Sequence, residues 1–167
     1  MTAPIFTIGR SNHGFARFAE LLNGAGIETV IDVRSQPVSR WVPHFNRTAL
    51  ESALAALGIG YVFLGRELGG RPADPELRRK GKPDYAAMAQ APSFRSGIER
   101  VIEMRNDKRI ALMCAERDPA DCHRFMLIGR ELAAHGRSVA HILADGTLED
   151  QQSTEERVAT APHPRLL

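Results

Sequence analysis

Short apolar runs alternate with segments of helical periodicity along this chain, and that alternation restricts its possible folds more than any other feature. The runs combine aliphatic and β-branched residues and stop at glycine, proline or polar positions, as strands do. They cover residues 5–8, 29–34, 61–64, 109–114 and 138–143. Strands that alternate with helices form βαβ units, whose strands are parallel. We therefore predict an α/β fold, a Rossmann-like three-layer sandwich around a mainly parallel sheet of about five strands.

The segments between these runs carry apolar residues at helical spacing. We predict helices over residues 15–24, 47–57, 94–104 and 121–135. Residues 1–150 are expected to form a single domain, because no low-complexity tract interrupts the pattern. Residues 151–167 are polar and contain proline, so we expect a C-terminal tail that is mobile or loosely docked.

Composition narrows the functional classes. The 167 residues carry 22 basic and 20 acidic side chains, largely interspersed, and this balance argues against a nucleic-acid partner. No apolar stretch approaches the ~18 residues of a membrane span and no secretory leader is recognisable, so we expect a cytoplasmic protein without a membrane partner. The two cysteines are then expected to be reduced thiols rather than a structural disulfide.

Polar side chains follow the predicted strands at their carboxyl ends, which is where open parallel sheets bind ligands. The first strand is followed by Arg10, Ser11, Asn12 and His13, the second by Arg34, Ser35 and Ser39, the third by segment 65–71, and the fourth by Cys114, Glu116 and Arg117. The carboxyl ends of parallel strands share one edge of the sheet. These side chains are therefore predicted to form one site, suited to a small anionic or nucleotide-like ligand.

The loop after the fourth strand holds the densest group of reactive side chains. Cys114 ends the strand and Glu116 lies in the loop. Cys122, His123 and Arg124 open the next helix, where free backbone N–H groups favour anions and thiolates. We predict a catalytic role for both thiols and for Glu116, with His123 as general acid or base and Arg124 as an anion ligand. The alternative is that Cys114 is simply a buried core residue and that His123 and Arg124 lie at the helix start without a functional role.

Metal binding is not predicted. The eight-residue separation of Cys114 and Cys122 lacks the close spacing of zinc ligands. No other motif points to a particular cofactor, and none indicates an oligomeric state.

Asp32 is an acidic residue inside an otherwise apolar strand, where an unpaired carboxylate is costly. Two roles are open for it: Asp32 anchors the following turn by pairing with Arg10 or Arg34, or it binds the ligand directly. Arg34 at the strand end, together with Ser11 and Ser39 in neighbouring loops, is expected to contact the ligand.

Segment 65–71 combines three glycines with two arginines. It does not match a P-loop or a dinucleotide fingerprint, because no glycine in it is predicted to begin a helix. Together with the basic residues 78–82 it is expected to form a solvated surface excursion. A lid that closes over an anionic ligand is the alternative.

Four motifs occur in order along the chain: Thr7-Ile8-Gly9-x-Ser11, Asp32-Val33-Arg34-x-x-Pro37-x-Ser39, Leu64-Gly65-x-x-Leu68-Gly69-Gly70, and Cys114-x-Glu116 followed by Cys122-His123-Arg124. In this order and spacing the chain resembles the DUF488 family of bacterial and archaeal proteins, named for having no assigned function. The resemblance implies a Rossmann-like α/β sandwich and no settled substrate. It also implies a site built from Ser11, Asp32, Arg34, Cys114, Glu116, Cys122, His123 and Arg124. The family often carries histidine or tyrosine where this chain has Arg10, so no role for position 10 follows.

The order of elements is also similar to rhodanese-like sulfurtransferases, in which a cysteine at a strand end lies in an anion-binding loop before a helix. Here the loop after Cys114 is longer and more acidic. Glu116 and Asp118 would repel a thiosulfate-like anion, so simple rhodanese activity is not expected.

Three functions are open on this evidence. The first is a small-molecule enzyme that uses the Cys114, Glu116, Cys122 and His123 cluster in thiol chemistry. The second is a nucleotide-handling enzyme in which Glu116 acts on a glycosidic bond and arginines hold phosphates. The third is a non-enzymatic module that senses an anion.

Overall fold

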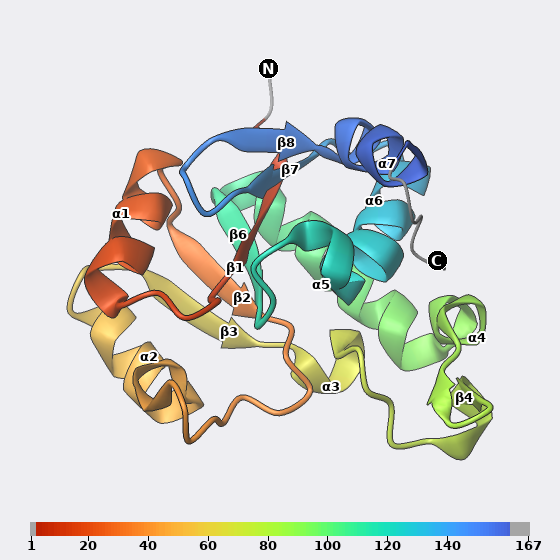
Figure 1. Ribbon diagram of the computed structural model, residues 1–167. Coiled ribbons are helices and arrows are strands. Elements are labelled where there is room, and N and C mark those ends of the chain that lie inside the picture. Colours follow the sequence, from red (N-terminus) through yellow and green to blue (C-terminus); the bar gives the residue numbers. More distant parts are fainter. Residues whose placement is uncertain (1–2, 161–167) are drawn as a thin grey trace.

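The computed structural model describes residues 3–160 and contains a six-stranded sheet between layers of helices (Figure 1). The strand order is β3-β2-β6-β1-β7-β8. Five strands are parallel: β1 Ile5–Gly9, β2 Thr29–Asp32, β3 Gly60–Phe63, β6 Ile110–Cys114 and β7 Val139–Ile142. The sixth, β8 Leu148–Asp150, is antiparallel to β7 at the edge. The predicted α/β sandwich with a mainly parallel sheet is confirmed, with one strand more than expected.

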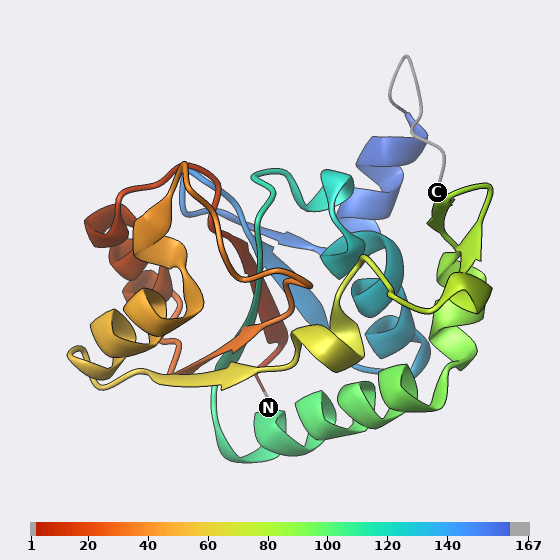
Figure 2. The ribbon, with the colours of Figure 1, turned by 90° about the horizontal axis from the view of Figure 1, so that it is seen from below.

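Helices cover both faces of the sheet. Seen from below, α1 and α2 lie on one side and α5 and α6 on the other (Figure 2). The helices are α1 Phe15–Gly24, α2 Arg47–Ala55, α3 Gly65–Leu68, α4 Tyr85–Gln90, α5 Pro92–Asp107, α6 Arg130–Ala134 and α7 Gln151–Ala159. No helix within residues 3–160 has the length and apolar character needed to cross a membrane.

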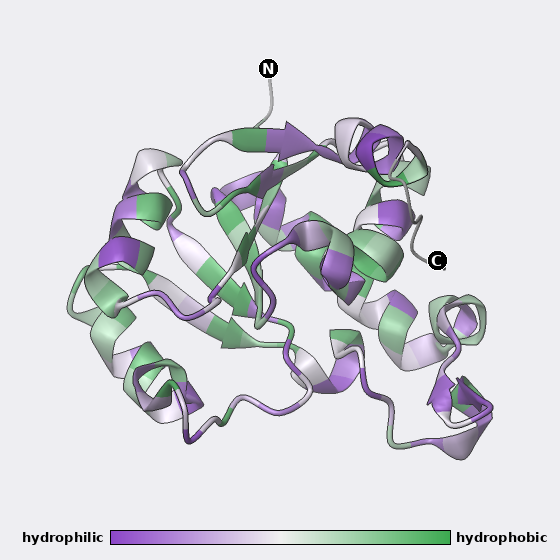
Figure 3. Ribbon diagram, in the orientation of Figure 1, coloured by the Kyte–Doolittle hydropathy of each residue, from purple (hydrophilic) through white to green (hydrophobic). Residues whose placement is uncertain are grey.

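Strand β6 shows how the alternation of side chains divides the core. Ile110, Leu112 and Cys114 belong to the cluster that packs under α5 and α6. Ala111 and Met113 belong to the cluster that packs under α1 and α2. Both sets are apolar, as expected for a central parallel strand buried on two faces, and the strands are hydrophobic in Figure 3. Period-two alternation therefore fixes the direction of the Cys114 side chain, toward the α5 and α6 layer.

The register of the sheet brings the ends of the central strands to one level. Gly9 at the end of β1 pairs with Cys114 at the end of β6, and Asp32 at the end of β2 pairs with Met113. The backbone N–H of Arg10 then donates to the Cys114 carbonyl over 2.9 Å. The loops that follow β1, β2 and β6 consequently meet at one edge, as the positions of their polar residues predict.

The segment expected as one helix over residues 121–135 has a more complex course. Cys122 is extended (φ −130°, ψ 147°), and a π-helix, Arg124–Gly129, precedes α6. A π-helix widens the turn, and such segments are frequent at functional sites. The helix thus begins later than predicted, because Cys122 continues the loop that approaches the sheet edge.

The chain after residue 150 begins with a helix where we expected a loosely docked tail. Asp150 caps α7 by accepting a hydrogen bond from the Ser153 N–H over 2.7 Å. Gln151, Thr154 and Val158 are buried, so this helix packs on the domain. Its apolar face is too narrow to stand out in the sequence, and residues 161–167 of the expected tail lie outside the described residues.

A buried histidine joins α7 to the sheet. The His141 ring accepts from the Thr7 hydroxyl over 2.6 Å and donates to Oε1 of Gln151 over 2.9 Å, an assignment set by the amide oxygen, which only accepts. The Gln151 amide in turn donates to the carbonyl of Phe125 over 3.1 Å. Burial lowers the pKa of His141 from 6.5 to about 4, so the ring is neutral at pH 7.

This histidine makes stability depend on pH. The unfolded chain protonates His141 near pH 6.5 and the folded chain only near pH 4, so its stabilising contribution is complete above pH 6.5 and is lost as the pH falls to 4. In urea titrations, we expect the stability advantage of the wild type over His141→Gln to shrink by about 3 kcal/mol across that range. His135→Gln, at an exposed position on the end of α6, is the control and should follow the wild type. If the difference in unfolding free energy between the wild type and His141→Gln stayed constant with pH, the lowered pKa of His141 would be contradicted.

Candidate functional site

A fully buried arginine lies behind the loop that follows β6. The Nη1 group of Arg124 donates to Sγ of Cys114 over 2.9 Å and to the carbonyl of Glu116 over 3.1 Å. Its Nη2 group donates to the carbonyl of Arg117 over 3.3 Å. Within residues 3–160, Arg124 forms no salt bridge with a carboxylate. Among the three acceptors of its Nη groups, only the sulfur of Cys114 can carry a negative charge.

The thiol of Cys114 is shifted toward its ionised form. Complete burial by itself raises the pKa of this thiol. A hydrogen bond from Cys122 and the positive charge of Arg124 outweigh that effect, so the pKa of Cys114 is lower than that of an ordinary thiol. Burial, the hydrogen bond to Cys114 and the negative charge there raise the pKa of Cys122. Of the two, Cys114 is thus the more readily ionised thiol and Cys122 the less readily ionised.

The ring of His123 lies next to this pair and is held in one orientation. Its Nε2 atom is 2.9 Å from the carbonyl of Val33, which only accepts, so Nε2 carries the proton. Its Nδ1 atom is 3.4 Å from Sγ of Cys122. Burial lowers the pKa of His123, which leaves Nδ1 unprotonated and able to accept a proton from the Cys122 thiol.

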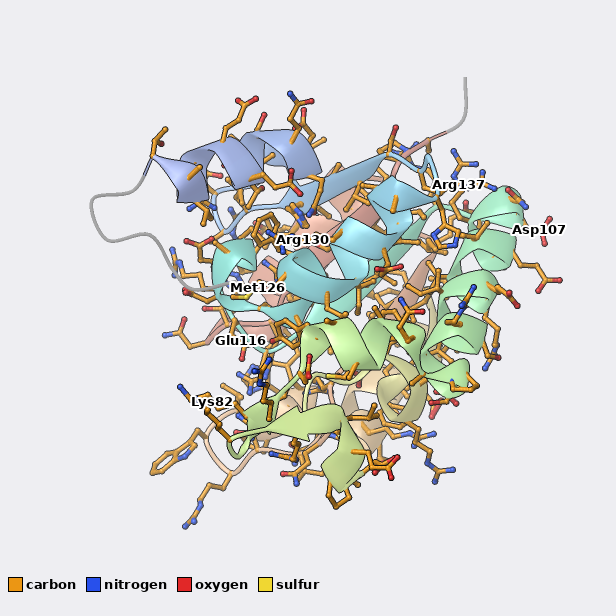
Figure 4. All side chains as sticks on the ribbon, turned by 90° about the vertical axis from the view of Figure 1, so that its right-hand side faces the viewer. Lys82, Asp107, Glu116, Met126, Arg130 and Arg137 are labelled. Atoms are coloured by element: carbon orange, nitrogen blue, oxygen red, sulfur yellow. The ribbon has the colours of Figure 1, made fainter. Side chains whose placement is uncertain are left out.

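These groups form the floor of a cleft of about 460 Å³. Its walls come from the loops after β1, β2 and β6 and from the hairpin of β4 (Arg78–Arg79) and β5 (Lys82–Pro83). Figure 4 shows Glu116 and Lys82 on the same side of the molecule, with Asp107 at the opposite side. The lining residues that carry charge or chemistry are Arg10, Arg34, Ser39, Arg71, Arg78, Tyr85, Cys114, Glu116, Asp121, Cys122 and His123.

Asp32 lies beneath the cleft as an anchor for Arg34. Its carboxylate accepts from Nε and Nη2 of Arg34, each over 2.9 Å, and from the Tyr61 hydroxyl over 2.6 Å. Burial together with this hydrogen bond raises the pKa of Tyr61 well above its usual range. Arg34 also donates to the carbonyl of Phe45 over 2.7 Å, which fixes the guanidinium as it enters the cleft wall. Of the two roles open for Asp32, the geometry favours the anchoring one.

Three other predicted ligand residues take different positions. Ser39 lines the cleft, although its hydroxyl also accepts from the N–H of Trp41 over 3.1 Å. Ser11 has a left-handed backbone (φ 48°), and within the part of the chain that the structure describes it is not among the cleft-lining residues. Arg124 supports Cys114 from behind and does not reach the cleft. These two positions are not placed to contact a ligand as predicted.

Tyr85 and Arg78 line the cleft without having been predicted as site residues, whereas Arg71 belongs to segment 65–71, which was expected at this edge of the sheet. The arginines lie in the segment predicted as a solvated excursion, and both are exposed, as that prediction requires. Nothing local marks Tyr85, which follows the hairpin and reaches the cleft only through the tertiary fold. Sequence position alone does not show which residues of such a surface segment line the cleft.

Two expectations about neighbouring segments need correction. Gly65 does begin a helix, the four-residue α3, and only glycine fits there because a Cβ atom would overlap the carbonyl oxygen of Arg34. Asp118 pairs with Arg157 over 2.8 Å and is not among the cleft-lining residues of the described chain. Asp118 therefore does not repel an anion in the cleft as expected, whereas Glu116 and Asp121 both line it.

The cluster also contains donor atoms that a metal could use. One ligand atom each from Cys114, Glu116 and Cys122 lies within 4.8 Å of the others. However, the guanidinium of Arg124 already donates to Cys114 and would repel a divalent cation at that sulfur. We therefore assign no metal to these residues.

Comparison with known proteins identifies the family. Residues 14–130 match the family described as "Domain of unknown function DUF488", which covers more than half of the chain. The chain belongs to the DUF488 family. No curated protein and no solved structure matches it. The resemblance expected from the four motifs is confirmed, and the family brings no assigned activity to this DUF488 protein.

Gly9 lets the loop after β6 lie against β1 in this DUF488 chain. A Cβ atom at position 9 would meet the carbonyl oxygen of Glu116 at 1.8 Å and Nη1 of Arg124 at 2.8 Å. We expect Gly9→Ala to lower the free energy of unfolding by about 2–3 kcal/mol, since backbone cannot yield as a flexible side chain can. Gly14→Ala, where nothing lies within 4 Å, should cost less than about 1 kcal/mol. Equal stability of both variants in urea unfolding would refute this packing.

Proposed function

We propose that this DUF488 protein is a thiol-dependent enzyme that acts on a small anionic substrate, with the Cys114 thiolate as nucleophile. The observation that carries the proposal is the 2.9 Å contact between Sγ of Cys114 and the buried guanidinium of Arg124. A thiolate, unlike a thiol, is a strong nucleophile.

The energetics of a buried charge support a thiolate at 114. A guanidinium stays protonated in proteins, and leaving it unpaired in the interior costs several kcal/mol, on the order of 3–5. Arg124 is 0% exposed, and the other acceptors of its Nη groups are neutral carbonyls. A negative sulfur at 2.9 Å offsets that cost, and a neutral thiol would not.

The charge on the cleft walls supports an anionic substrate. The guanidinium groups of Arg10, Arg34, Arg71 and Arg78 line the same cleft. Arginine suits carboxylate and phosphate groups because it presents paired N–H donors. Glu116, the exposed carboxylate near the sulfurs, is the candidate for carrying a proton to or from a leaving group.

The first test measures the alkylation of Cys114 by iodoacetamide as a function of pH. An ordinary thiol with a pKa of about 8.5 loses about tenfold in rate for each pH unit below that value. We expect the rate at Cys114 to stay nearly constant between about pH 8 and pH 6, because its thiolate persists there. Arg124→Met should restore the ordinary dependence, while Arg130→Met, at an exposed position just beyond the π-helix, should not. A wild-type rate that follows an ordinary thiol would overturn the proposal.

The second test addresses the charge of the cleft. Relative to free cysteine, Cys114 should prefer the anionic reagent iodoacetate over neutral iodoacetamide by about tenfold or more at low salt. Arg71→Gln should reduce this preference, because Arg71 lines the cleft. Arg79→Gln is the matched control, since Arg79 is equally exposed in the hairpin and is not a cleft-lining residue of the described chain. If Arg71→Gln and Arg79→Gln preferred iodoacetate over iodoacetamide to the same degree, the proposal that the substrate is an anion would be contradicted.

A second function uses the same cleft without thiol chemistry. Glu116 lines the cleft beside the arginines, so a nucleotide could bind with its phosphates on the arginines and its glycosidic bond near this carboxylate. The two functions separate by mutation. Thiol chemistry requires Cys114 and tolerates Cys122→Ala in alkylation, whereas nucleotide chemistry tolerates serine at both cysteines and fails in Glu116→Gln.

A further inference from the structure

We propose that Cys122 is the resolving partner of Cys114 and that the substrate is a small disulfide bearing carboxylate groups. The protein would reduce this disulfide and end the half-reaction with an internal Cys114–Cys122 bond. This inference rests on the proposed function, because Cys114 must first act as a nucleophile.

The two sulfurs are already neighbours at the cleft floor. They lie within 4.8 Å of each other, and both cysteines are free thiols. The bond length of a disulfide is about 2.05 Å, so closure requires a side-chain rotation and a small shift of the backbone. Cys122 has extended backbone, and its carbonyl accepts from the N–H groups of Phe125 and Met126 over 3.0 and 3.2 Å, so rotation of the two cysteine side chains must supply most of the movement. Cys122 is therefore placed to attack Cys114 once that sulfur carries a leaving group.

His123 gives the Cys122 proton a destination. The ring lies 3.4 Å from Sγ of Cys122 through Nδ1, and its Nε2 group is fixed on the carbonyl of Val33. Gly70 leaves room for this ring, because a side chain there would meet it at 2.8 Å. A neutral imidazole next to a protonated thiol is the arrangement that general-base activation of a second nucleophile requires.

The cleft fits a carboxylate-bearing disulfide. Its volume of about 460 Å³ exceeds what a peroxide or an inorganic anion would occupy, and lies within the usual range of small-molecule sites. Arg34 is fixed in its wall, while Arg71 and Arg78 stand on the exposed side. Arginines from three segments of the chain thus line the cleft, which suits a molecule with a carboxylate on each arm.

The chemical steps balance as a two-electron exchange. The Cys114 thiolate attacks one sulfur of the substrate, forming a mixed disulfide and releasing the first thiolate. Cys122 passes its proton to Nδ1 of His123 and attacks Sγ of Cys114. The bond to the substrate breaks, and the second thiolate leaves with the proton from His123. The first thiolate takes a proton from solvent, so the substrate is reduced to two thiols while the protein is oxidised to a disulfide, and a dithiol reductant restores the protein.

Intact mass spectrometry of the reduced full-length protein tests the order of these steps. With oxidised glutathione and a metal chelator present, the wild type should lose two hydrogen atoms and accumulate little glutathione adduct. Cys122→Ser should instead accumulate one glutathione on Cys114. Cys114→Ser should react at least about tenfold more slowly than Cys122→Ser, because its remaining thiol is largely protonated. Cys122→Ala is the second variant, in case serine in this buried position impairs folding, and it should behave as Cys122→Ser does.

Two results would overturn the inference. The wild type could keep the glutathione adduct as Cys122→Ser does, which would show that Cys122 does not resolve it. Alternatively, neutral hydroxyethyl disulfide could react with the wild type as fast as oxidised glutathione, after each rate is divided by its rate with free cysteine. That outcome would remove the anionic substrate class.

These failures are distinguishable from failure of the proposed function. If alkylation shows an activated Cys114 and the wild type still retains the adduct, only the resolving role of Cys122 is lost. If alkylation of Cys114 follows an ordinary thiol, the nucleophile itself is absent and both proposals fall together.

Discussion

The hydrogen bond from Arg124 to Cys114 organises this end of the molecule. The guanidinium of Arg124 donates hydrogen bonds to the sulfur of Cys114 and to the carbonyls of Glu116 and Arg117. The loop after β6 is therefore fixed around a single buried cation. Gly9 on β1 leaves the space that this loop and Arg124 occupy, since any larger residue would collide with both. The charge of Arg124 thus ties the course of the loop to the ionisation of the thiol.

A second arginine organises the neighbouring wall in a different way. Arg34 is held bidentately by Asp32 and contacts the carbonyl of Phe45, so its position is set by protein partners before any ligand arrives. Arg71 and Arg78 are exposed, and Arg78 donates to the carbonyls of Pro72 and Gly81 over 2.9 and 3.3 Å. The cleft is therefore lined by one buried arginine that is fixed by an acidic partner and by exposed arginines from other segments.

Much of the fold could be predicted from the sequence, because each parallel strand is a compact apolar run between turn residues. Cys114, Cys122, His123 and Arg34 were predicted to meet for the same reason: they follow strands whose carboxyl ends share an edge. The role of Arg124 could not be predicted in this way. An arginine beside a histidine at a helix start resembles an exposed anion ligand, and only the packing shows that it is buried. Likewise β8 and α7 carry few apolar residues, so their docking depends on the contacts of Gln151 with the buried His141.

The most direct measurement of the central claim is the ultraviolet absorbance of the thiolate during an acid titration of the reduced protein. We expect thiolate absorbance at neutral pH that disappears on acidification below the ordinary range of cysteine, is abolished in Cys114→Ser, and moves toward higher pH in Cys122→Ala, which lacks the hydrogen bond to Cys114. A wild-type protein without thiolate absorbance at neutral pH, or with absorbance that survives in Cys114→Ser, would contradict it. In that case the charge of Arg124 would have to be balanced by something other than the sulfur beside it.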